Sequence, residues 1–109
     1  MSTEQDEKNQ ATLRALLDAG ADLSKPTELS FYVYAESKSL AGLFAEGERA
    51  DGWDCEVRPP LDGYTEWLVL LKTHAVPSFE RISGFTERFL RREALFGVQF
   101  DGWEALVTK

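Results

Sequence analysis

The sequence predicts an α+β domain in which an extra N-terminal helix precedes a strand–helix–strand–strand–helix–strand unit. Apolar and polar residues alternate over Glu28–Glu36, as in a strand with one buried face. A continuous apolar run at Trp67–Leu71 indicates a central strand that is buried on both faces. The chain has 109 residues, the usual length of one domain, so residues 1–109 are predicted to form a single domain with residues 1–10 frayed.

The first predicted element is a helix over about Glu4–Ala19. Leu13, Leu16 and Leu17 follow the i, i+3, i+4 spacing of one helix face. Gly20 follows directly, and glycine tolerates the positive φ that is common at the C-terminal end of a helix.

The first predicted strand, Glu28–Glu36, has two unlike faces. Phe31 and Val33 lie on an apolar face, whereas Tyr32 and Tyr34 lie on the other. Because two tyrosines lie on that second face, we expect it to be partly covered, and the N-terminal helix is the element expected to cover it.

The second predicted helix begins after Ser37, whose hydroxyl suits a helix N-cap. Three apolar residues share one face of this helix by their spacing: Leu40, Leu43 and Phe44. Glu46 and Glu48 are then expected on the solvent side. Gly42 and Gly47 each weaken the helix by about 1 kcal/mol relative to alanine. Either packing compensates for this cost, or the helix lies close to the sheet.

A hairpin is predicted from a short strand, Trp53–Val57, and a longer one within Tyr64–Ala75. The segment between them, Arg58–Gly63, contains two prolines, which cannot donate to a sheet ladder. Its last two residues, Asp62 and Gly63, favour a tight bend.

The last helix is predicted over about Pro77–Glu93, because proline suits the first turn of a helix. Five apolar residues share its core face by spacing: Phe79, Ile82, Phe85, Phe89 and Leu90. Arg91 and Arg92 are expected in the last turn, where they complement the negative end of the helix dipole. The fourth strand is expected over Val98–Val107, with a bend at Gly102.

This order of elements is that of a ferredoxin-like βαββαβ sandwich. It predicts an antiparallel four-stranded sheet with strand order 4-1-3-2 and two helices on one face. The extra N-terminal helix is an addition to that plan.

The residue types argue against catalysis, a metal centre or a bound cofactor, and we expect none of the three. His74 is the only histidine and Cys55 the only cysteine, and no nucleotide-binding or nucleophile motif surrounds any residue. Cys55 is interpreted as a small apolar residue in a strand. Met1–Gln10 does not resemble a signal peptide, and no apolar run reaches the ~20 residues of a membrane span, so a cytoplasmic protein that does not contact membranes is expected.

The net charge of −7 opposes capture of nucleic acid, so we expect no direct contact with it. Aromatic residues on the first and third strands are used by RNA-recognition domains, but their basic motif is missing here. The acidic excess falls in residues 1–62 and has two readings: it keeps the domain soluble, or it attracts a basic protein partner. Six residues are the candidate partner contacts: Glu46, Glu48, Asp51, Asp54, Asp101 and Trp103. For Asp101 and Trp103 the alternatives are a turn with a core anchor, or an exposed binding anchor.

Three segments, in order, resemble the regulator of ribonuclease E activity B family (RraB). They are LLDAGADLSKPTELSFYVYAES, DGWDCEV and GVQFDGWEALV. The most specific piece is the aromatic-Asp-Gly-Trp motif at Phe100, Asp101, Gly102 and Trp103, and the resemblance extends over about Thr12–Val107. Members best known for this activity also carry a long acidic C-terminal tail, which these segments do not include.

The resemblance implies a ferredoxin-like fold and no enzymatic activity. It implies a small cytoplasmic protein that binds ribonuclease E, or a degradosome component, and inhibits RNA cleavage. The family's contact lies in the basic scaffold region of the endonuclease, to which an acidic regulator is complementary. The alternative is a ligand-binding or self-associating ferredoxin-like module that is unconnected with RNA decay.

Overall fold

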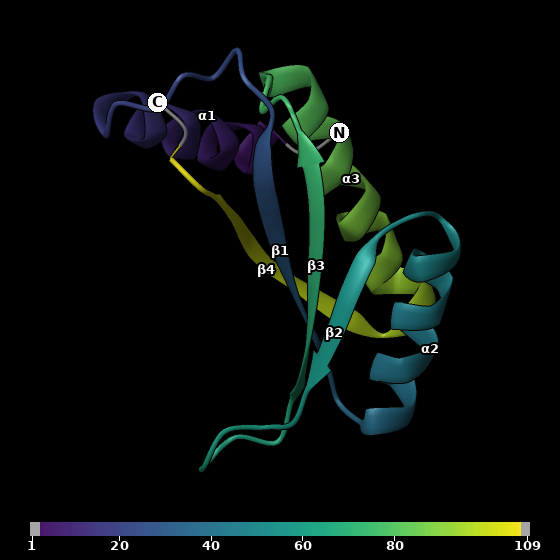
Figure 1. The fold of residues 1–109 in the computed structure, drawn as a ribbon. Coiled ribbons are helices and arrows are strands. Elements are labelled where there is room, and N and C mark those ends of the chain that lie inside the picture. The colour runs from purple at the N-terminus through teal and green to yellow at the C-terminus, as the bar shows by residue number, and fades with distance from the viewer. Residues whose placement is uncertain (1–2, 108–109) are drawn as a thin grey trace.

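The computed structural model describes residues 3–107 and contains the predicted elements in the predicted order (Figure 1). The elements run α1 (Thr3–Asp18), β1 (Thr27–Ala35), α2 (Lys38–Ala50), β2 (Asp54–Arg58), β3 (Trp67–Ala75), α3 (Phe79–Phe96) and β4 (Val98–Ala105). The end of β3 at Ala75 and the start of β4 at Val98 are as predicted, and the other strand ends differ from the prediction by one to three residues. Met1 and Ser2, which were predicted to fray with the rest of residues 1–10, lie outside the described residues, whereas the helix begins at Thr3.

The four strands form one antiparallel sheet in the order β2-β3-β1-β4. This is the predicted order, with β1 and β3 in the centre. In the β1–β3 register, Phe31 lies opposite Leu71 and Tyr32 opposite Leu70. Since opposite residues in an antiparallel pair share a face, this register separates an apolar face from the face that carries the tyrosines.

The apolar face of the sheet carries the core beneath the helices. Phe31 is fully buried at its centre, and its ring contacts the rings of Trp53, Phe85 and Phe89 with centroids 5.2–5.6 Å apart. Trp103 stacks on the same ring at 6.3 Å. The ferredoxin-like core is therefore organised around one aromatic side chain of a central strand.

The first helix lies on the helix-bearing side of the sheet, not over the tyrosine face, so that prediction is wrong. Leu13 and Leu16 of α1 belong to the same buried cluster as Phe31, and α1 packs against α3. Figure 1 shows α1 running across the strand direction beside the first turns of α3. Of the predicted stripe, Leu17 is exposed. The face of the sheet that carries the tyrosines has no helix on it within residues 3–107.

A buried polar network fixes α1 in this place. The side chain of Asn9 is fully buried, donates to the Thr86 hydroxyl on α3 and accepts from the Trp103 indole nitrogen on β4, both at 2.9 Å. These bonds satisfy an amide that would otherwise be costly to bury. Asn9 therefore joins α1, α3 and β4.

The second helix begins as predicted, with the Ser37 hydroxyl accepting from the Leu40 amide, but its buried face is rotated from the predicted one. The buried residues are Ala41, Phe44, Ala45 and Glu48. Leu43, predicted in the apolar stripe, is 61% exposed. Small alanines rather than leucines therefore face the sheet.

The third helix begins at Phe79 after the N-cap Ser78, so Pro77 lies before its first turn and not within it as predicted. The helix ends at Phe96, three residues beyond the predicted end, with Gly97 in the left-handed conformation (φ 67°). The expectation that Arg91 and Arg92 occupy the last turn is therefore wrong, because that turn holds no basic residue. Its core face is as predicted, with Ile82 and Phe89 fully buried. None of the helices within residues 3–107 has both the length and the apolar character needed to cross a membrane.

Candidate protein-binding surface

The face of the sheet opposite the helices, here called the open face, carries both apolar and charged side chains. The strand registers place Tyr32 and Tyr34 of β1 beside Leu70 and Leu68 of β3. Leu70 is almost fully buried although no helix covers it, because its neighbours on the sheet enclose it. The open face thus includes an apolar strip formed by these side chains, beside its charged residues.

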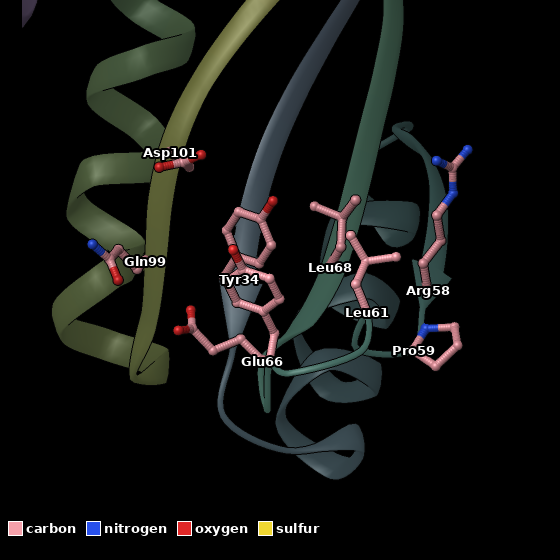
Figure 2. A pocket seen from close by; sticks show the side chains of 9 residues that line it. Tyr34, Arg58, Pro59, Leu61, Glu66, Leu68, Gln99 and Asp101 are labelled. Carbon is pink, nitrogen blue, oxygen red and sulfur yellow. The ribbon is translucent and has the colours of Figure 1, made fainter.

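A groove of about 560 Å³ lies at one end of the open face, where the β2–β3 loop (residues 59–66) begins and ends. Figure 2 shows Tyr34 and Leu68 on the sheet, Leu61 and Pro59 on the loop side, and Gln99 and Asp101 on β4. Tyr64 completes the apolar lining. Local turn chemistry forms the loop, since Gly63 adopts φ 85° and the Tyr64 amide donates to the Leu61 carbonyl at 3.0 Å.

Carboxylates outnumber cations on and around the open face. Six acidic residues lie there by register or as groove lining: Glu28, Asp54, Glu56, Glu66, Asp101 and Glu104. The cations are Arg58 and Lys72, and both are already paired: Arg58 with Glu56 at 2.7 Å and Lys72 with Glu28 at 3.4 Å. The remaining carboxylates give this face a negative potential.

One of those carboxylates is tied to the sheet by a tyrosine. The Tyr32 hydroxyl donates to Glu104 Oε1 at 2.5 Å across the β1–β4 pair. This bond to the carboxylate, together with partial burial, raises the pKa of Tyr32 to about 12. A donated bond to a carboxylate favours the protonated phenol, which is the direction observed.

Glu48 was predicted on the solvent side, and that prediction is wrong because its side chain is 1% exposed. It lies on the buried face of α2 and accepts from Arg88 at 2.6–3.0 Å and also from Arg92, both on α3. A carboxylate can be buried here only because two guanidinium groups bind it.

Asp51, a second predicted contact residue, belongs to the same cluster. Arg88 also donates to it, although about half of the Asp51 side chain remains exposed. Burial alone would lower the pKa of Arg88, but its bonds to Asp51 and Glu48 outweigh burial and raise that pKa. The cluster is a clamp of ion pairs between α2 and α3, not a free acidic surface.

The other predicted contact residues separate onto different surfaces. Asp54 and Asp101 are both exposed at the open face, but on opposite edge strands. Asp101 of β4 lines the groove, whereas Asp54 lies at the end of β2 away from it. Glu46 is exposed on α2, in the helix layer. Trp103 is partly buried on the helix side of the sheet, where its indole nitrogen donates to Asn9. Of the two alternatives for Trp103, this position fits the core anchor and not the exposed binding anchor. The predicted residues therefore do not form one site.

Sequence reasoning missed most of the groove. Tyr34 and Leu68 are neighbours across the β1–β3 pair, which only the strand register reveals. Three further lining residues were predicted as parts of a turn or a strand: Leu61, Tyr64 and Glu66. The one local signal was the presence of large apolar residues inside a polar, proline-containing connector. Leu61 and Tyr64 are indeed 77% and 70% exposed.

The single histidine and the single cysteine do not belong to a metal-ligand cluster within the described residues. His74 is exposed at the end of β3, and no group of three or more His, Cys, Asp or Glu between residues 3 and 107 is placed to hold a metal ion. Cys55 is buried as predicted, and burial raises the pKa of its thiol to about 11, so the thiolate nucleophile is scarce at neutral pH.

Fold and surface together define a two-layer α+β domain with one covered and one uncovered sheet face, the latter grooved and acidic. The profile of the family described as "Regulator of ribonuclease activity B" matches residues 6–105. The chain belongs to this RraB family, which is a regulatory one. No individual curated protein matches the chain.

Proposed function

We propose that this protein regulates a ribonuclease, of the ribonuclease E type, by binding the enzyme or a component of its degradosome in the cytoplasm, and that it catalyses no reaction itself. The observation that carries the proposal is the family match, which spans nearly the whole described chain. The structure supports a binding role, because the open face is uncovered and combines an apolar strip with acidic residues. Such a mixture is typical of protein-binding surfaces.

The charge of the open face supports regulation through the protein partner rather than through RNA. Phosphate binding needs cations that replace counterions, whereas both cations of the open face are paired with carboxylates. A negative face instead accelerates encounter with a basic protein segment.

The test is a cleavage assay with purified ribonuclease E, a labelled RNA and increasing amounts of this protein. We expect the cleavage rate to fall as the protein saturates the enzyme, and inhibition to weaken as salt is raised. A gel-shift with the same RNA alone provides the control, and it should show no complex. Unchanged cleavage together with no co-elution of the two proteins at low salt would contradict the proposal.

A second candidate is a ligand-binding or self-associating module, and the uncovered groove is the observation that favours it. Self-association through the open face would produce a symmetric dimer. Sedimentation across a range of protein concentrations distinguishes the two candidates, since the regulator account expects a monomer that is free to bind its partner. A concentration-independent dimer would favour the second candidate.

A further inference from the structure

We infer that the groove at the β2–β3 end of the open face binds a short polypeptide segment in which an apolar side chain is flanked by lysine or arginine. This inference rests on the proposed function, because it names the part of the protein partner that would be recognised and the surface that recognises it. It commits the interaction to the open face and excludes the helix layer.

The groove lining offers apolar side chains to a partner. Tyr34 and Leu68 form its base on the central strands, and Leu61 extends it along the loop (Figure 2). Tyr64 of the same loop also lines the groove. Leu61 and Tyr64 remain mostly exposed, so their apolar surface is not used by the fold. Large side chains of this kind, when covered by a partner, supply much of the binding free energy at interfaces.

The rim of the groove, formed by Glu66 and Asp101, carries negative charge. Glu66 and Asp101 line the same side of the groove in Figure 2, and neither forms an ion pair with any residue of the described chain. Arg58 lies across the groove, but Glu56 binds it through both its Nε and a terminal nitrogen at 2.7–2.8 Å. The rim therefore presents unpaired negative charge beside an apolar base, to which a cationic and apolar segment is complementary.

Side chains of the protein itself occupy a main-chain group on each edge strand of the sheet. On edge strand β2 the Arg49 side chain donates to the Cys55 carbonyl at 2.9 Å. On edge strand β4 the Glu93 carboxylate accepts from the Phe100 amide at 2.8 Å, and a bulge near Gly102 interrupts the register. A partner strand would have to displace these side chains to pair there, which favours recognition by side chains on the open face.

The other occupants of such a face are disfavoured by the same charges. Single-stranded RNA could stack on tyrosines, but its phosphates would lie against Glu66 and Asp101. A second copy of this chain would bring two acidic rims together, which costs binding energy.

The experiment uses the full chain and a short fluorescein-labelled peptide in which arginines flank a central leucine. Anisotropy is measured beside a counterpart with glutamate in place of arginine, a counterpart with serine in place of leucine, and a labelled oligouridine. We expect binding of the arginine–leucine peptide only, weakening by about tenfold or more when salt rises from low to physiological concentration. Preference for the oligouridine or for the glutamate peptide would overturn the inference.

Two double variants locate the site. The first combines L61A with Y64A and removes apolar lining, and the second combines E66Q with D101N and removes rim charge. We expect each double variant to weaken peptide binding by about tenfold. Controls in the helix layer are L43A and E46Q, which change another exposed leucine and an exposed glutamate. Both should stay within about twofold of the wild type. Circular dichroism confirms that each variant is folded. Equal losses in the control variants, or no loss in the groove variants, would contradict the assignment.

The ribonuclease assay separates this inference from the proposed function. If the groove variants lose the peptide yet still inhibit the ribonuclease as the wild type does, the regulator stands and the groove assignment is wrong. If the wild type binds the peptide at the groove but leaves the ribonuclease unaffected, the groove chemistry stands and the proposed partner is wrong. Loss of both activities in the groove variants alone supports both.

Discussion

Glu48 is the residue whose role depends most on its surroundings. It is an acidic side chain fully enclosed between two helices, where Arg88 and Arg92 neutralise it. Desolvation makes such a pair costly to assemble, but removing one partner costs more, because the remaining charge loses its counterion.

For the variant E48Q we expect the free energy of unfolding to fall by about 3 kcal/mol, the low end for a broken buried pair, since Asp51 still binds Arg88. Urea denaturation measures the change. E46Q, two residues away and exposed on the same helix, is the control and should change stability by less than about 0.5 kcal/mol. An E48Q protein as stable as the wild type would show that the clamp contributes nothing net.

Tyr32 gives a pH-dependent signature of the open face. Its pKa is raised from 10.0 to about 12 by the bond to Glu104, so the bond stabilises the fold below pH 10 and that contribution is lost as pH rises towards 12. We therefore expect Y32F to be less stable than the wild type at pH 8, with the difference shrinking as the pH approaches 12. Parallel denaturation of both proteins at several pH values measures this, and a difference independent of pH would contradict the assigned bond.

At the scale of elements, periodicity located the helices and strands but did not orient them fully. In α2 the sequence favoured Leu43 as a core residue and Glu48 as a surface one, by hydrophobicity alone. The spacing Ala41, Phe44, Ala45 and Glu48 also fits one helix face, and the structure uses that face. A buried carboxylate is recognisable only together with its arginines, which lie forty residues later in the chain.

The placement of α1 could not be derived from its own residues. Its leucine stripe predicts one buried face but not which surface it meets, and the tyrosines of β1 suggested the wrong one. The deciding contacts, from Asn9 to Thr86 and Trp103, join residues far apart in the sequence. Local pattern therefore predicted the elements, while long-range polar contacts decided their packing.

The two interior glycines of α2 have no packing role, which resolves the choice left open by the sequence. A Cβ added at Gly42 or Gly47 would meet nothing within 4 Å. We expect G42A and G47A each to raise the free energy of unfolding by about 0.5–1 kcal/mol, because alanine restricts the unfolded chain and favours helix. Thermal or urea denaturation measures the gain.

Gly97 provides the matched control for that prediction. It also has open space around its Cα, but its φ of 67° is one that L-residues rarely adopt. We expect G97A to destabilise the protein by about 1 kcal/mol. If all three substitutions shifted stability in the same direction, backbone conformation would not be the controlling factor.

At the scale of the molecule, the asymmetry between the two sheet faces is the central feature. Strand order, fold class and the absence of helices from one side follow from the topology that the sequence predicted, apart from α1. The candidate surface was predicted only in part: Asp54 and Asp101 lie on it, whereas Glu48 is buried and Glu46 and Trp103 lie elsewhere. The groove is lined by residues of all four strands and of the β2–β3 loop, and no local sequence pattern encodes how these segments meet.

If the open face of this RraB-family domain binds the ribonuclease, leucines on the two sides of the molecule should respond differently. Leu61 and Leu68 line the groove, with Leu68 partly buried, while Leu43 and Leu95 are exposed in the helix layer. Methyl NMR spectra of leucine-labelled protein, recorded while ribonuclease E is added, report each position. We predict that the signals of Leu61 and Leu68 shift or broaden while those of Leu43 and Leu95 stay unchanged. Changes confined to Leu43 and Leu95, or no change at any leucine, would contradict it.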